Sequence, residues 1–264
     1  MPGLKNTVQS HLNLSHLTFQ EVEKEIAGNP ALILPLGGCE PYGEYGTLGT
    51  VSAVVEALAT ALSSKLHLLL APTQAFGCST PYSAFGGSAG LKARTLTNIL
   101  CETIRQWYGQ GFRAVIIIDG QFDNSEAVDQ ALRRLKNVKP EMKICAFSLQ
   151  RDERVRAFIG QHVQGKEYGR TEYGLSSLAA FIDPGLVREP KKNSPLTKAP
   201  DPECYTTWRK RGADPEHYRK LFPNASAGNS ACRFNVDFGE NLFDFILQLL
   251  IAAVATLSSS GRSP

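Results

Sequence analysis

The sequence predicts an α/β protein in which helices cover both faces of a largely parallel sheet, a three-layer αβα arrangement. Short apolar runs alternate with segments of helical pattern, which is typical of βαβ units. The apolar runs are nearly continuous, as expected of strands buried on both faces. A chain of 264 residues is long enough to bury a large core, and we expect one domain spanning residues 1–264.

The first helix and the first strand have clear boundary signals. Thr18 and Glu21 have the spacing of a capping box, which predicts that a helix begins here. The helix is expected to end near Gly28, ahead of Asn29 and Pro30. The apolar run from Ala31 to Leu36 then predicts the first strand.

The middle of the chain continues the alternation of helix and strand. A loop from Thr73 to Gly90 is longer than a simple connection requires, and such loops often line sites. The expected helices are Thr50 to Ser64, Leu96 to Tyr108 and Asn124 to Leu135, and the expected strands are Leu68 to Pro72, Ala114 to Ile118 and Lys143 to Leu149.

The last third of the chain has a weaker pattern. Helices are expected from Asp152 to Gln161 and from Leu175 to Phe181, and the proline-rich segment from Glu189 to Pro202 is expected to be an exposed loop. A final helix from Phe238 to Leu257 is apolar nearly all round, which predicts burial or an oligomer contact. Its most apolar run, from Phe245, is shorter than the ~20 residues that cross a bilayer, so no membrane partner is expected.

Composition excludes several other classes. A net charge of +3 is too small to predict nucleic acid or an anionic membrane as a partner. The six cysteines are scattered without a C-x-x-C pair, which argues against a zinc ribbon and a disulfide framework and suits a cytoplasmic location. The N-terminus lacks the apolar region of a signal peptide. Neither G-x-G-x-x-G nor a P-loop is present, so a nucleotide-binding protein is a distant alternative.

Two loops follow the expected strands and carry the polar groups of a site. The first, 37–46, contains four glycines, Glu40 and Glu44, and the second, 119–124, contains two aspartates, Gln121 and Asn124. Ligands bind outside the carboxyl ends of the strands in such sheets. Because both loops leave carboxyl ends, we expect them to lie at one edge and to face each other across a pocket.

These loops resemble the motifs of the creatininase (creatinine amidohydrolase) family. The segment 34–51 is similar to the family's L-P-x-G-S-x-E-Q-H-G-x-H-x-P-x-x-T-D, and 119–124 to its N-G-H-x-E/G-N. Segments 76–88 and 183–187 also fit, in the same order along the chain. The resemblance implies an αβα fold, hydrolysis of a C–N amide bond in a small molecule, two divalent metals, and a homo-oligomer, commonly a hexamer.

The metal-ligand positions implied by the resemblance are mostly substituted. Glu40 is present, but the His expected two residues later is Tyr42 and the motif's last Asp is Val51. The second loop has Gln121 for His and Asp123 for Glu. Two further histidines are also missing, because the position in the long loop is Tyr82 and the region 168–170 contains none. Phenol and amide groups are poor zinc ligands and valine is none, so we assign no metal ligands and no firm cofactor.

The remaining polar groups define the candidate site. Glu40 and Asp123 are the expected catalytic residues, because two converging carboxylates divide into an acid and a base. The alternative for Asp123 is a helix cap with Glu126. The candidate substrate-binding residues are Tyr42, Glu44, Tyr82 and Gln121. Alternatively, the carboxylates and the Gln121 carbonyl could weakly hold a divalent cation, Mg²⁺, Ca²⁺, Mn²⁺ or Zn²⁺.

Two functions remain open from the sequence. The first is an amidohydrolase-like enzyme that acts on a small cyclic or linear amide without the usual binuclear centre. The second is a catalytically inactive family member that serves as a ligand-binding or oligomeric scaffold protein.

Overall fold

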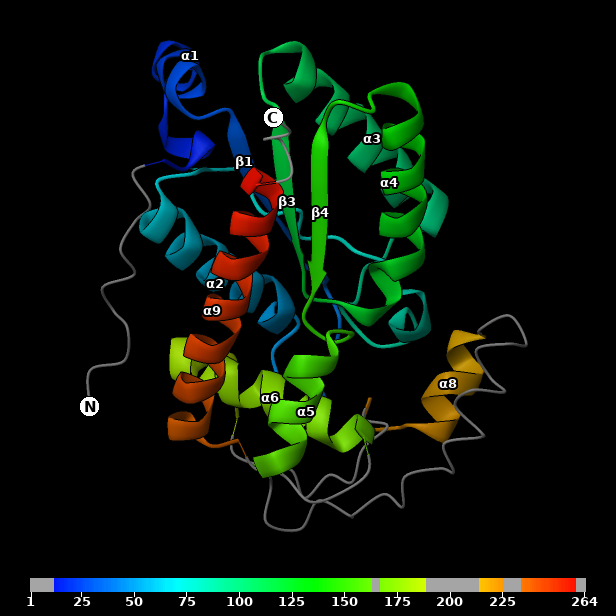
Figure 1. Cartoon of the computed structure of the whole chain (residues 1–264). Coiled ribbons are helices and arrows are strands. Elements are labelled where there is room, and N and C mark those ends of the chain that lie inside the picture. The colour runs from blue at the N-terminus through cyan, green and yellow to red at the C-terminus, as the bar shows by residue number, and fades with distance from the viewer. Residues whose placement is uncertain (1–11, 163–166, 189–213, 226–233, 260–264) are drawn as a thin grey trace.

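The computed structural model describes residues 12–162, 167–188, 214–225 and 234–259, with the side chains of 167–171, 258 and 259 left out. Its centre is a parallel sheet of four strands in the order β2-β1-β3-β4 (Figure 1). The strands are β1 (Ala31–Leu36), β2 (Leu69–Leu70), β3 (Ala114–Asp119) and β4 (Lys143–Ser148). Every pair is parallel, which confirms the predicted fold class.

Alternate side chains of the strands fill two separate cores. Ile33 and Ile116 point into one core, and Leu34 and Ile117, one position further along their strands, point into the other. Since side chains of a strand alternate between its faces, continuous apolar runs are needed to fill both. The two cores explain why β1 and β3 are buried at nearly every position.

Helices cover both faces of the sheet, as predicted (Figure 1). Helices α2 and α9 close the core on one face of the sheet, and α5 and α6 extend it beyond the carboxyl ends of the strands. Helices α1, α3 and α4 close the core on the other face. The bounds are α1 (Phe19–Gly28), α2 (Thr50–Leu66), α3 (Ala93–Gly109), α4 (Ser125–Val138), α5 (Glu153–His162), α6 (Glu167–Ile182), α8 (Pro215–Leu221) and α9 (Val236–Ser259). Four 3₁₀ turns complete the description: η1 (Leu14–His16), η2 (Thr80–Tyr82), η3 (Phe122–Asn124) and η4 (Pro184–Leu186).

The observed boundaries of helices and strands agree best with the predicted ones where a capping interaction fixes the end of the element. The Thr18 backbone N–H donates to Glu21 Oε2 at 2.7 Å, and the Glu21 N–H donates to Thr18 Oγ1 at 3.4 Å, so the predicted capping box is confirmed. The second strand is much shorter than predicted, because only Leu69 and Leu70 pair with β1. The proline-rich segment 189–202 lies outside the described residues.

The last helix differs from its prediction in length and in burial. Helix α9 has 24 residues, and its buried side chains form one stripe, which includes Phe238, Leu242, Ile246 and Leu250. The predicted burial is therefore met by one stripe of the helix, and an oligomer contact for its remaining apolar surface stays a prediction. In the described part of the chain, α9 is long and apolar enough to cross a membrane by length and composition, with 22% of its most apolar window buried. The helix is thus longer than the apolar run seen in the sequence, although the core helix of a soluble protein can have the same length and composition.

Candidate functional site

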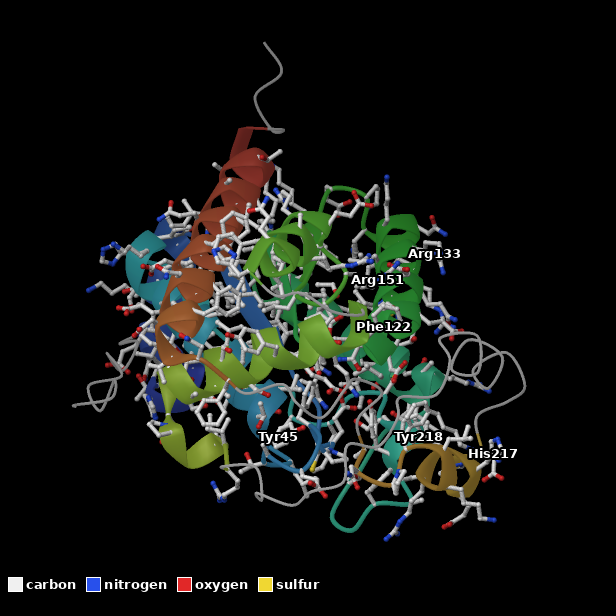
Figure 2. The ribbon with its side chains drawn as sticks, turned by 90° about the horizontal axis from the view of Figure 1, so that it is seen from below. Tyr45, Phe122, Arg133, Arg151, His217 and Tyr218 are labelled. Atoms are coloured by element: carbon white, nitrogen blue, oxygen red, sulfur yellow. The ribbon has the colours of Figure 1, made fainter. Side chains whose placement is uncertain are left out.

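The loops after β1 and β3 meet at the carboxyl edge of the sheet, which Figure 2 shows from below. The Gly120 N–H donates to the Leu36 carbonyl at 3.0 Å, and the Gly37 N–H donates to the Gln74 carbonyl at 2.9 Å. A third segment therefore lies at this edge, the long loop that follows Gln74 between β2 and α3. The prediction that the first two loops share one edge is confirmed, and the long loop joins them there.

The Asn124 side chain connects all three segments. Its Oδ1 accepts from the Cys78 backbone N–H at 2.7 Å. Its Nδ2 donates to the Gly37 carbonyl at 3.2 Å and to Asp119 Oδ1 at 2.9 Å. The Asn124 side chain is fully buried, so these contacts are formed away from water. Asn124 was not among the site residues predicted from the sequence, although it is the last residue of the family motif in its loop.

Glu40 and Gln121 are in direct contact at the centre of the site. The Gln121 Nε2 group donates to Glu40 Oε2, to Ser79 Oγ at 2.8 Å and to the Cys78 carbonyl at 3.3 Å. Glu40 is 3% exposed and Gln121 is 1% exposed. Two of the predicted site residues are thus joined by a hydrogen bond, which lies where open space was expected between the loops.

Glycines make this close approach of the loops feasible. A Cβ atom on Gly77 would lie 2.2 Å from Gln121 Oε1, and one on Gly38 would lie 2.5 Å from the same oxygen. Both distances are far shorter than a non-bonded contact allows. Gln121 Oε1 is itself buried and has no hydrogen-bond partner among the described residues. The glycines of the sequence therefore make room for the Gln121 side chain.

Asp119 lies beneath the site at the end of β3 and is 1% exposed. Its Oδ1 accepts a hydrogen bond from the Gln121 backbone N–H at 3.1 Å, in addition to the one from Asn124 Nδ2. Burial raises the pKa of Asp119 to about 7, although these hydrogen bonds and the distant charge of Arg151 act in the opposite direction. Asp119 was not among the site residues predicted from the sequence. A charged residue that ends an otherwise apolar strand was the available signal.

Two of the substituted ligand positions are occupied by packed side chains. The Tyr42 hydroxyl accepts from Gln150 Nε2 at 2.5 Å, and the same Gln150 nitrogen donates to the Gly120 carbonyl at 2.7 Å. Val51 is fully buried in α2, where a Cβ on Gly120 would lie 2.7 Å from Val51 Cγ1. Tyr42 and Val51 thus stabilise the loops from the side of α2.

Asp123 and Glu44 lie further out. Asp123 belongs to the half-exposed turn η3, and Glu44 is exposed on the first loop. The predicted capping box at Asp123 is wrong, because α4 begins at Ser125 and Asn124 is its N-cap residue without a side-chain cap bond. The Asn124 side chain is engaged by the three loop segments instead. Convergence of Glu40 and Asp123 stays a prediction.

Tyr82 packs in an aromatic cluster beside the site. Its ring centroid lies 5.3 Å from that of Tyr218 in an edge-to-face arrangement and 6.3 Å from that of Phe85. Aromatic pairs of this geometry are stabilising, so the contacts favour a packing role for the Tyr82 side chain. Figure 2 shows Tyr218, the partner of Tyr82 in this cluster, on the same side of the molecule as Tyr45 of the first loop. A role for Tyr82 in binding a substrate stays a prediction.

The donor groups of the site do not fit a binuclear zinc centre. Val51 has no donor atom, the Tyr42 hydroxyl is engaged by Gln150, and Gln121 presents its amide nitrogen to Glu40. Zinc sites in proteins need thiolate, imidazole or carboxylate ligands. Within the described ranges there is no group of three or more His, Cys, Asp or Glu side chains that could hold a metal ion.

Cys78, which lies beside the site, is not an activated thiol. Burial, together with the charges of Asp119, Glu126 and Glu40, raises the pKa of Cys78 to about 11. A thiol with so high a pKa is a poor nucleophile at neutral pH. Cys39 is half-buried and its Sγ donates weakly to the Gly87 carbonyl at 3.5 Å. The four described cysteines are free, while Cys204 and Cys232 lie outside the described residues.

Comparison with known proteins agrees with the motifs. The creatininase family model, described as creatinine amidohydrolase, matches residues 15–254. A creatinine amidohydrolase from Pseudomonas putida is 26% identical over 133 residues, which are 47% of this chain and 51% of that protein. A mycofactocin precursor peptide peptidase from Mycobacterium ulcerans is 28% identical over 120 residues, 40% of this chain and 46% of that one. The chain thus matches about half the length of these relatives.

Solved structures share the fold along nearly the whole chain. A crystal structure of creatinine amidohydrolase has a TM-score of 0.70 at 20% identity, over 93% of this chain and 97% of that one. A structure of creatininase with manganese has a TM-score of 0.69 at 20% identity, over 93% of this chain and 98% of that one. At this identity the likeness establishes the fold, whereas the family match rests on the sequence. The chain belongs to the creatininase family.

Proposed function

We propose that this protein hydrolyses the C–N amide bond of a small cyclic or linear amide at Glu40, without the usual binuclear metal centre. The observation that carries the proposal is the buried Glu40 carboxylate at the carboxyl edge of the sheet, hydrogen-bonded to Gln121. The names of both kinds of curated relative denote hydrolysis of an amide, one in creatinine and one in a peptide.

The proposed chemistry assigns a separate role to each predicted residue. Glu40 takes a proton from the attacking water, and Asp123, on the half-exposed turn η3, returns a proton to the leaving nitrogen. Gln121 holds the Glu40 carboxylate in place, while Tyr42, Glu44 and Tyr82 contact the substrate. Without a metal to polarise the carbonyl, this arrangement suits an amide that is strained or otherwise labile. A weakly held Mg²⁺, Mn²⁺ or Zn²⁺ is the alternative cofactor.

A second function is a catalytically inactive family member that binds a ligand or forms an oligomeric scaffold. The packed positions of Tyr42 and Val51 favour it, because they close the space where ligands to a metal would be expected. The partly exposed apolar surface of α9 also favours it, since such a surface suits a contact with a second copy. On this proposal the protein is a cytoplasmic homo-oligomer, with a hexamer as the expected form and residues 1–264 as one domain.

One experiment separates the two functions. Purified protein is assayed against creatinine, hydantoins and short peptides, with EDTA or with added Mn²⁺ or Zn²⁺. Turnover that persists in EDTA and is abolished in Glu40→Gln supports the hydrolase, and Glu126→Gln, at an exposed carboxylate of α4, is the control that retains it. Saturable binding without turnover supports the scaffold. Loss of turnover in EDTA with recovery on addition of Zn²⁺ would overturn the metal-free proposal.

A further inference from the structure

The amide nitrogen of Gln121 lies among three oxygen atoms that come from two different loops. Glu40 Oε2 is supplied by the loop after β1, and Ser79 Oγ and the Cys78 carbonyl are supplied by the loop after β2. Glu40, Cys78 and Ser79 are all buried, as is Gln121 itself. A carboxylate, a hydroxyl and a carbonyl that converge on one point are the donors that Mg²⁺ and Mn²⁺ prefer.

The side-chain amide has one favourable orientation in this surrounding. With Nε2 inward, two N–H groups face three acceptors, and the carboxylate receives a hydrogen bond. With Oε1 inward, the amide oxygen would face the Glu40 carboxylate and the Cys78 carbonyl, which both repel it. The inward nitrogen leaves Oε1 buried without a partner among the described residues, between Gly38 and Gly77. The contact with Glu40 is therefore favourable enough to outweigh an unsatisfied carbonyl.

The charge within the site is negative. Glu40 is buried in the site, whereas Asp119 beneath it keeps its proton up to about pH 7. The carboxylates of Glu40 and Glu126 add a negative field at this loop, which contributes to the raised pKa of Cys78. The positive end of an amide dipole satisfies such a field in part, and a cation would satisfy it fully.

We propose that the Gln121 amide takes the place of a cation in this chain, so that the native protein keeps no divalent ion between Glu40 and Ser79, and that replacing the amide by an oxygen ligand creates a site for one. The site would take a hard divalent cation, with Glu40 Oε2, Ser79 Oγ and the Cys78 carbonyl as ligands and water in the remaining positions. Gln121 would thus be the residue that makes this family member independent of metal.

The decisive variant is Gln121→Glu, because it keeps the size of the side chain and changes the inward nitrogen to a carboxylate oxygen. Gln130→Glu on α4 is the matched control. Gln130 Nε2 donates to Glu126 Oε1 at 3.0 Å, so the same two residue types make the same contact on the surface. Both variants place a second carboxylate beside an existing one, and the surroundings of the pair are what differs.

Binding of Mn²⁺ is measured by the loss of the electron paramagnetic resonance signal of the free ion, in full-length protein without substrate. We expect no saturable binding by the native chain up to about 1 mM. Gln121→Glu is expected to bind one Mn²⁺ per chain at least about tenfold more tightly than Gln130→Glu. The double variant Glu40→Gln, Gln121→Glu is expected to lose that binding. Mn²⁺ should also raise the melting temperature of Gln121→Glu and leave that of the native chain unchanged.

Two results would overturn the proposal: stoichiometric Mn²⁺ binding by the native chain, or binding by Gln121→Glu no tighter than by Gln130→Glu. If Gln121→Glu fails to fold even in Mn²⁺, then Gln121→Ala, which empties the position, is judged by the same two criteria. The inference rests on the proposed function only for the absence of a native metal. The Mn²⁺ measurement uses no substrate, so its outcome does not depend on whether the protein hydrolyses an amide. The two proposals can therefore be overturned independently.

Discussion

Replacing the buried Asp119 by asparagine is expected to change how the stability of the protein depends on pH. Asp119 Oδ1 accepts hydrogen bonds from the Gln121 N–H and from Asn124 Nδ2, and an asparagine oxygen can accept them as well. The substitution therefore removes the ionisation with little change in shape. Any difference between variant and native protein that varies with pH can then be assigned to the Asp119 proton.

The sign and size of the effect follow from the pKa of Asp119. Burial raises it from 3.8 to about 7, so the folded state keeps its proton where the unfolded chain has lost it. The stabilising contribution of that proton is complete below the unfolded pKa and is lost as the pH rises through about 7. At about 1.4 kcal/mol per pKa unit, burying the charged form costs about 4 kcal/mol above pH 7. Asp119→Asn avoids this cost.

Urea unfolding of both proteins at matched pH values is the assay. The free energy of unfolding of Asp119→Asn, minus that of the native protein, should increase by about 3 kcal/mol from about pH 5 to about pH 8. Groups that titrate in both proteins cancel in this difference. A difference that stays constant over the range would refute the assignment of a buried, protonated carboxyl at the end of β3.

Three further predictions concern the loops of the site. Asn124→Ala should lower the free energy of unfolding by about 3 kcal/mol in urea, because buried polar groups of three segments lose their partner, and a change below about 0.5 kcal/mol would contradict that role. Gly77→Ala should destabilise the protein by about 2 kcal/mol or more in thermal unfolding, because its Cβ would overlap Gln121 Oε1. Gly28→Ala is the control: no atom lies within 4 Å of its Cβ, so this change should be neutral or should stabilise by about 0.5 kcal/mol. At about pH 8 less than about 1% of Cys78 should be thiolate, so mass spectrometry should find it alkylated by iodoacetamide only after denaturation, and rapid labelling of the folded protein would argue against its burial.

The fold could be predicted from sequence because its signals are local. The apolar runs at 31–36 and 114–118 are strands in the structure, and the Thr18 capping box begins a helix where the pattern placed it. The exception is α9, whose sequence is apolar on more sides than the structure buries. Composition gives the total apolar surface of a helix, but which part of it meets the core depends on tertiary packing.

The candidate site was predicted only in part, because its contacts join residues that are distant in sequence. Motif position led to Glu40 and Gln121, and the structure joins them across 81 positions. Asn124 and Asp119 were missed, since their importance comes from burial and from partners on other segments. Asp123 fitted a capping box by spacing, but the geometry of η3 gives the N-cap position to Asn124 instead. Spacing identifies which residues could interact, whereas burial decides which of them do.

The attachment of three segments to the Asn124 side chain has a consequence for how the edge of the sheet moves. The Cys78 N–H, the Gly37 carbonyl and the Asp119 carboxyl lose the same partner at once if that side chain swings away. Amide hydrogens of the three segments should then exchange with solvent as one cooperative unit, with a single opening free energy. A small molecule that reaches Glu40 by separating the loops would have to wait for that opening, so its rate of entry would be limited by local unfolding and not by diffusion.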